Sequence, residues 1–210
     1  DELGVTDFQI NTPFPGGEAN DAKQALALGV ADLARFHCEL ADIWLERGAD
    51  RAVRIGPFDQ LVNYFTQRDA TLPCIWGRNC ADEFIAVDAR GHVAQCDCWV
   101  TSYPDYRFGN ILECDSLSEL LRDSPARRRF TERPVQLMQR DCIDCDYLAL
   151  CHGGCPVRTY SRYQTLLEKD PYCELYKQLF RHIEDQATRL AGTGAMNPLT
   201  ANQVEEALGR

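Results

Sequence analysis

The chain has 210 residues, a net charge of −10 and eleven cysteines. The acidic excess argues against nucleic acid as a partner, and the lack of about 18 consecutive apolar residues argues against a membrane. An odd number of cysteines without a signal peptide fits a disulfide framework poorly, so we expect a cytoplasmic protein whose cysteines bind metal.

The N-terminal part of the chain predicts one strand and two helices. Residues 5–13 alternate loosely between apolar and polar side chains, as a strand does. Apolar side chains at helical spacing predict a helix over residues 22–47 that Gly48 ends, and Pro57 opens a shorter helix. Because one parallel strand needs neighbouring strands, this βα unit predicts further sequence of the same kind upstream.

The middle of the chain predicts a hairpin and two helices. Residues 83–100, EFIAVDARGHVAQCDCWV, have the apolar alternation of two strands that turn at residues 88–91. The first helix begins with a capping box formed by Ser116 and Glu119, and the second begins at Pro125.

A last helix is predicted at residues 171–190 from its apolar spacing. Mixed strands and helices of this kind give an α+β fold class. We expect three parts: residues 1–70, a cysteine-rich domain at 71–185, and a polar C-terminal tail at 186–210.

The clearest motif is Cys142-x2-Cys145-x5-Cys151-x3-Cys155. Four thiolates within fourteen residues suit a soft metal centre. A single tetrahedral zinc ion could use the same four sulfurs, so this motif alone leaves zinc and iron–sulfur open.

Further cysteines flank that motif. Cys74 and Cys80 precede Gly91-x4-Cys96, and Cys173 follows in the first turn of the last predicted helix. The whole pattern over residues 74–173 resembles the SPASM domain, the C-terminal extension of many peptide-modifying radical S-adenosylmethionine (radical SAM) enzymes. The resemblance implies two auxiliary [4Fe–4S] clusters with four thiolates each.

In that family the fourth cysteine of the compact motif ligates the other cluster, a crossing also known from two-cluster ferredoxins. The resemblance implies that Cys74, Cys80, Cys96 and Cys155 hold the first cluster, and that Cys142, Cys145, Cys151 and Cys173 hold the second. Such a crossing would fasten the hairpin to the compact motif, so cluster binding would contribute to folding.

Two further residues are candidates for function. Asp97 directly follows Cys96, and the related anaerobic sulfatase-maturating enzymes carry an Asp there that is proposed to take a proton from the substrate. The alternative is an exposed strand residue that points away from Cys96. Asn11, near the end of the first strand, is the candidate contact for S-adenosylmethionine.

The remaining cysteines and His152 are not among the eight predicted cluster ligands. Cys38 is expected to be a small buried hydrophobe, and Cys114 has no assigned role. On a strand, Cys98 would face the same side as Cys96, where it could replace a ligand or touch the substrate. His152 is expected to lie beside a cluster or on the surface rather than to ligate.

Radical SAM enzymes bind their reactive cluster through a C-x3-C-x2-C triplet, which is absent from this sequence. The ligands of that third [4Fe–4S] cluster are therefore expected upstream or on another chain. Residues 1–70 then resemble the closing part of the partial (β/α)6 radical SAM barrel, and this chain alone should not form the radical.

The expected function is the auxiliary-cluster half of a radical SAM maturase that oxidises or crosslinks a ribosomally synthesised peptide, by cyclophane or thioether formation. Its expected partners are the upstream barrel segment, the precursor peptide and an electron-transfer protein. Formylglycine formation in a sulfatase is the alternative that Asp97 supports. A zinc-binding scaffold without a redox role is the alternative from another class.

Overall fold

The structure is a computed structural model that describes residues 4–12, 28–47, 53–66, 68, 70–76 and 79–192. Two compact units can be distinguished. The first unit falls within residues 1–12, 29–73 and 174–210, and the second unit falls within residues 13–28 and 74–173. Among the described residues, no helix has both the length and the apolar character needed to cross a membrane.

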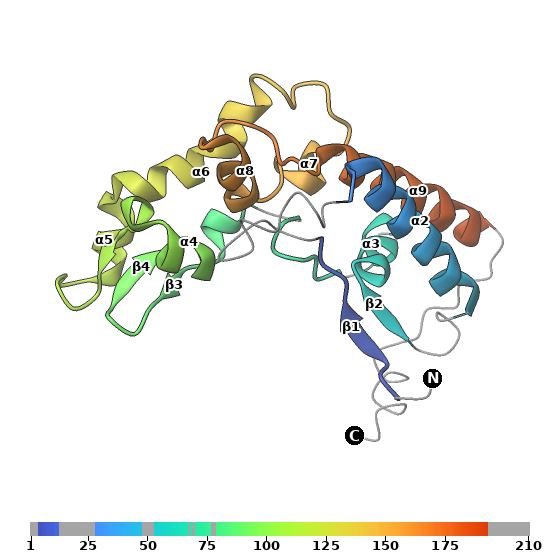
Figure 1. Cartoon of the computed structure of the whole chain (residues 1–210), viewed down its shortest axis with the longest axis horizontal. Coiled ribbons are helices and arrows are strands. Elements are labelled where there is room, and N and C mark those ends of the chain that lie inside the picture. The colour runs from blue at the N-terminus through green and yellow to red at the C-terminus, as the bar shows by residue number, and fades with distance from the viewer. Residues whose placement is uncertain are drawn as a thin grey trace. The chain divides into compact units, whose positions relative to one another are not determined.

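The described part of the first unit consists of two parallel strands with helices packed beside them (Figure 1). Its elements are β1 (Asp7–Gln9), α2 (Val30–Arg47), β2 (Arg54–Gly56), α3 (Phe58–Phe65) and α9 (Cys173–Gly192). Phe8 pairs with Ile55 across the two strands. His182 Nε2 on α9 lies 2.8 Å from Asp42 Oδ1 on α2, so these two helices are in direct contact.

For this unit, the predicted types of secondary structure are confirmed, but the predicted first and last residues of the elements are less accurate. The strand predicted at 5–13 is confirmed only at β1, and the long helix begins at Val30, with residues 22–27 and Gly48 outside the described residues. The helix after Pro57 is confirmed as α3. Strand β2 was not predicted, because three residues are too few for a periodic pattern to emerge.

The second unit contains a three-stranded antiparallel sheet in the order β3-β4-β5. The strands are β3 (Ala86–Val87), β4 (His92–Ala94) and β5 (Gly109–Asn110). The hairpin between β3 and β4 turns at the predicted residues. There Asp88 Oδ1 accepts hydrogen bonds of 2.9 Å from the backbone N–H groups of Arg90 and His92, and Gly91 has a φ of 84°.

Short helices make up most of the remainder of the second unit. They are η3 (Cys80–Asp82), α4 (Asp97–Ser102), η4 (Pro104–Tyr106), α5 (Leu117–Asp123), α6 (Pro125–Met138), α7 (Leu148–Cys151) and α8 (Pro156–Tyr163). Both predicted helix starts are confirmed: Ser116 Oγ accepts a hydrogen bond from the Glu119 backbone N–H at the start of α5, and α6 starts at Pro125.

The second strand of the hairpin is shorter than predicted. The prediction of a strand through residue 100 was wrong, because β4 ends at Ala94 and residues 97–102 form α4. Cys96 is still extended, with φ −155° and ψ 178°, and it caps the helix. Trp99 and Val100 favour strands by propensity, but their burial against the sheet overrides that preference.

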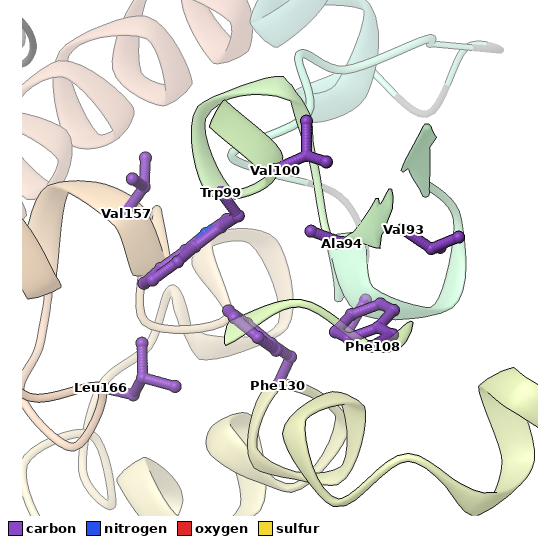
Figure 2. Packing of buried hydrophobic residues seen from close by; sticks show 9 residues of the cluster. Val93, Ala94, Trp99, Val100, Phe108, Phe130, Val157 and Leu166 are labelled. Atoms are coloured by element: carbon purple, nitrogen blue, oxygen red, sulfur yellow. The ribbon is translucent and has the colours of Figure 1, made fainter. Parts of the chain in front are cut away.

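Trp99 lies in the core of the second unit, among buried residues from several separate segments (Figure 2). Its ring meets that of Phe130 on α6 edge to face, with centroids 5.0 Å apart, and it also contacts Tyr160 on α8. Val93 on β4 is fully buried in the same core. This packing fixes the start of α4 and the start of α8, where Cys96 and Cys155 are the capping residues.

Candidate metal centre

All eleven cysteines are free thiols. The eight predicted ligands fall into two groups, judged by which thiols interact electrostatically, and Cys98 also interacts with Cys74 and Cys96 of the first group. The first group comprises Cys74, Cys80, Cys96 and Cys155. The second group comprises Cys142, Cys145, Cys151 and Cys173.

In the first group, Cys80 interacts with both Cys155 and Cys74, and Cys96 interacts with Cys155. Burial is the main cause that raises the pKa of Cys80 and of Cys96 to about 12, and that of Cys155 to about 11. Thiols buried in this way become thiolates only when a cation compensates their charge. Cys74 and Cys80 also line one cavity, together with Arg133, His152 and Gly154.

Polar side chains fix the position of Cys80 in this group. Gln95, which is 1% exposed, donates a 2.7 Å hydrogen bond from Nε2 to the Cys80 carbonyl. The preceding residue, Asn79, donates from Nδ2 to the Thr131 carbonyl at 3.3 Å. Asn79 also reaches the Phe130 carbonyl, which Pro134 leaves without its helical partner, because proline has no N–H.

In the second group, Cys151 interacts with Cys173 and Cys142, and Cys142 interacts with Cys145. Burial raises the pKa of Cys151 to about 12, and burial followed by the charge of Cys145 raises that of Cys142. Backbone turns hold these residues: the Cys145 N–H donates to the Cys142 carbonyl at 3.2 Å, and the Cys173 N–H donates to the Asp170 carbonyl at 2.9 Å.

A tight turn separates Cys151 of the second group from Cys155 of the first. His152, Gly153 and Gly154 all have positive φ, at 50°, 82° and 73°. A Cβ on Gly154 would lie 2.3 Å from Asp170 Cβ, so only glycine fits there. Three successive left-handed residues reverse the chain, which explains why cysteines four positions apart join different groups.

Arg133 on α6 is the most important residue near the thiols that the sequence analysis missed. It is 3% exposed and donates from Nε to the Leu166 carbonyl at 2.9 Å, from Nη2 to Gly153 at 2.9 Å and from Nη1 to Gly154 at 3.1 Å. Burial lowers the pKa of Arg133, and the charges of Asp170 and of cysteines in both groups oppose that shift. Arg133 therefore places a positive charge beside both groups of thiols.

Asp170 is 1% exposed, and its negative charge interacts with the positive charge of the Arg133 guanidinium. Its Oδ2 accepts a 2.8 Å hydrogen bond from the Cys155 N–H, and its Oδ1 accepts one of 2.8 Å from the Tyr172 N–H. One sequence signal could have revealed Arg133: it occupies the same helical stripe as Phe130 and Leu137, where an apolar residue is the norm.

Asp97 is the exposed first residue of α4. One carboxylate oxygen of Asp97 and the sulfurs of Cys96 and Cys98 all lie within 4.8 Å of one another. The alternative in which Asp97 is a strand residue that points away from Cys96 is therefore wrong, because the chain enters a helix at this point. Asn11 is exposed after β1 and belongs to the first unit, so its role stays a prediction.

Three histidines contact a backbone carbonyl or a carboxylate of the protein, as expected for residues with structural roles. His37 Nδ1 lies 2.7 Å from the Leu33 carbonyl, His92 Nδ1 lies 2.8 Å from Asp88 Oδ2, and His182 contacts Asp42 as described above. Cys38 on α2 is half-buried, not fully buried as predicted.

No protein-family model matches the chain. It is 28% identical over 153 residues to the serine-type anaerobic sulfatase-maturating enzyme of Bacteroides thetaiotaomicron, which covers 70% of this chain and 34% of that enzyme. It is 27% identical over 161 residues to a cysteine-type anaerobic sulfatase-maturating enzyme of Clostridium perfringens, which covers 76% of this chain and 42% of that enzyme. The chain therefore spans less than half the length of these curated relatives.

Solved structures show the same fold. The structure of native anSMEcpe with bound AdoMet matches 84% of this chain and 45% of its own chain, with a TM-score of 0.60 and 24% identity. A structure of native anSMEcpe with AdoMet and the Kp18Cys peptide matches 81% of this chain and 46% of its own, with a TM-score of 0.57 and 24% identity. The homologues of this chain are therefore anaerobic sulfatase-maturating enzymes, members of the radical SAM family, as the cysteine spacing predicted.

Proposed function

We propose that this chain is the auxiliary-cluster part of a radical SAM enzyme that oxidises a side chain of a peptide or protein. The observation that carries the proposal is that the eight predicted ligands interact within two sets of four, with Cys155 in the first set, its sequence neighbours in the second, and Cys98 as a further thiol beside the first. This partition agrees with the ligand sets that the SPASM resemblance implies.

The residues of each group fit a [4Fe–4S] cluster. Four thiolates are the usual ligand set of such a cluster, and Arg133 offsets part of their negative charge. The left-handed glycines at 153 and 154 let the backbone pass close to the sulfurs, as N–H donation to a cluster requires. When bound, the clusters would accept and pass on electrons.

Side-chain oxidation to formylglycine has more support than peptide crosslinking. The relatives are by name serine-type and cysteine-type sulfatase-maturating enzymes. Asp97 also supports it, because its carboxylate lies beside the first group and could take the proton that such an oxidation releases. Cyclophane or thioether crosslinking of a ribosomally made peptide rests on the SPASM resemblance alone.

The proposed enzyme needs components that the present residues do not supply. A C-x3-C-x2-C triplet would hold the third cluster and S-adenosylmethionine, and the relatives extend well beyond the matched region. We assign these roles to a radical SAM barrel segment, with residues 1–70 as its closing part. A peptide or protein substrate and an electron-transfer protein are the other proposed partners.

Anaerobically purified chain is expected to contain about eight irons and eight sulfides, because two cubanes with four cysteine ligands each account for the eight grouped thiols. Iron and acid-labile sulfide analysis measures this, and brown colour that dithionite bleaches gives an independent reading. Colourless protein with stoichiometric zinc and little iron would instead establish the zinc scaffold.

The Cys155→Ala variant is expected to lose the first cluster and keep the second, with about four irons left per chain. Cys155 interacts with the first group although it belongs to the compact motif. Iron analysis and electron paramagnetic resonance measure the loss, and Cys114→Ala is the control at a half-buried thiol outside both groups. Loss of the second cluster alone would show that the ligand sets are wrongly divided.

A further inference from the structure

We propose that Cys98 is an alternative ligand for the iron that Cys96 binds in the first cluster. The inference deepens the proposed function, on which it rests. Cys98 is the second residue of α4, and it belongs to neither set of four ligands. The first site would then have five thiols for four iron corners.

The geometry at the start of α4 supports the exchange. The sulfurs of Cys96 and Cys98 lie within 4.8 Å of each other, and both residues are half-buried at the same site. Cys98 also interacts electrostatically with Cys74, another proposed ligand of the first cluster. Cys98 is thus close to two of the four sulfurs that would surround this cluster.

The other unassigned cysteines lack these features. Cys38 is on α2 in the first unit, where its electrostatic neighbours are the acidic residues Asp42 and Glu39. Cys114 directs its sulfur to the Ile111 carbonyl at 3.8 Å. Among the three cysteines outside the two groups, only Cys98 lies beside proposed ligands.

The exchange is balanced in charge and atoms. One iron–sulfur bond breaks at Cys96 and one forms at Cys98, while the Cys98 thiol proton passes to the Cys96 sulfur, and no electrons are gained or lost. A short movement would suffice, because the two sulfurs lie within 4.8 Å of each other. Asp97 lies between the two cysteines, so the choice of ligand would also change the position of its carboxylate.

Four anaerobically purified proteins test the inference: the unchanged chain, Cys96→Ala, Cys98→Ala and the double variant. We expect about eight irons in the first three and about four in the double variant, with the resonance signal of the first cluster altered in Cys96→Ala. Cys80→Ala is the matched control, because the thiols that interact with it, Cys155 and Cys74, are already proposed ligands. That control should fall to about four irons.

The outcomes separate this inference from the proposed function. If the unchanged chain holds no iron, the proposed function itself fails. If the unchanged chain holds about eight irons and Cys96→Ala falls to about four, as Cys80→Ala does, then Cys98 does not replace Cys96. A double variant that keeps its full iron content would also overturn the inference, because neither sulfur would then be needed. The irons retained in the second group report that each variant has folded.

Discussion

The Arg133→Met variant is expected to lose about 3–5 kcal/mol of unfolding free energy, because the change removes one partner of a buried charged network. Arg133 is 3% exposed and Asp170 is 1% exposed. Methionine fills a similar volume, but it removes the positive charge that interacts with the buried Asp170 carboxylate. Loss of a buried hydrogen-bonded network is among the few causes of so large an effect.

The backbone carbonyls around Arg133 add to this loss. The guanidinium donates to the carbonyls of Leu166, Gly153, Gly154 and Glu168, and to Thr159 Oγ1. These groups lie in segments that carry or adjoin Cys151, Cys155 and Cys173. The Gly153 carbonyl would keep its bond from the Asp170 N–H. A buried carbonyl left without a donor costs about 1–3 kcal/mol, so the loops should also loosen.

Thermal unfolding of the iron-loaded chain, followed by circular dichroism at one scan rate, measures the effect. A loss of about 3–5 kcal/mol lowers the midpoint of a chain of this size by roughly 6–20 °C. Arg128→Met is the matched control, because Arg128 is an exposed arginine on the same helix and should shift the midpoint very little. Arg133→Lys keeps the charge without the planar fork and should lie between the two.

An unchanged midpoint in Arg133→Met would mean that the network does not stabilise the fold. The turn at residues 152–154 would then depend on its glycines and on the clusters alone. A shift of equal size in Arg128→Met would assign the effect to α6 in general and not to the buried charge.

Local patterns allowed several elements to be predicted from sequence. Leu175, Leu179 and Ile183 follow helical spacing, and all three are buried on α9. The turn after Asp88 was equally clear, because an Asx side chain followed by glycine specifies its own backbone hydrogen bonds. In each case the residues that determine the structure are close together in the sequence.

Elements that depend on distant partners were not predicted. Strand β5 has two residues, and it exists because it pairs with β4. The change from strand to helix after Ala94 depends on where Trp99 is buried, which involves Phe130 and Tyr160 far along the chain. Side-chain alternation alone could not distinguish these outcomes.

The candidate site shows the same division. The eight cysteines were visible from their spacing, but their partition into two groups came from the family resemblance. Arg133 and Asp170 are buried and lie 37 positions apart in the sequence. They were missed because neither residue belongs to a recognisable sequence motif. Such a pair is recognised only when the fold brings its members together.

The Asp97→Asn variant of the full-length enzyme is expected to form product at least about a hundredfold more slowly, because a positioned base accelerates proton transfer by about 10² to 10⁴. Oxidation of a serine or cysteine side chain to an aldehyde removes an O–H or S–H proton as well as a hydrogen atom and an electron. The Asp97 carboxylate lies beside Cys96 and is exposed, so a substrate bound at the first cluster could reach it.

The design separates proton transfer from cluster loss and from folding. Asparagine keeps the size of the side chain, so iron content should stay unchanged and 5′-deoxyadenosine should still form without product. Asp105→Asn is the matched control, because Asp105 is another exposed acidic residue of the second unit and should keep normal turnover. If Asp97→Asn forms product at a near-normal rate, another group takes the proton. Formylglycine formation would then rest on the relatives alone, and Asp97 would be an exposed helix-start residue that favours α4 through its charge.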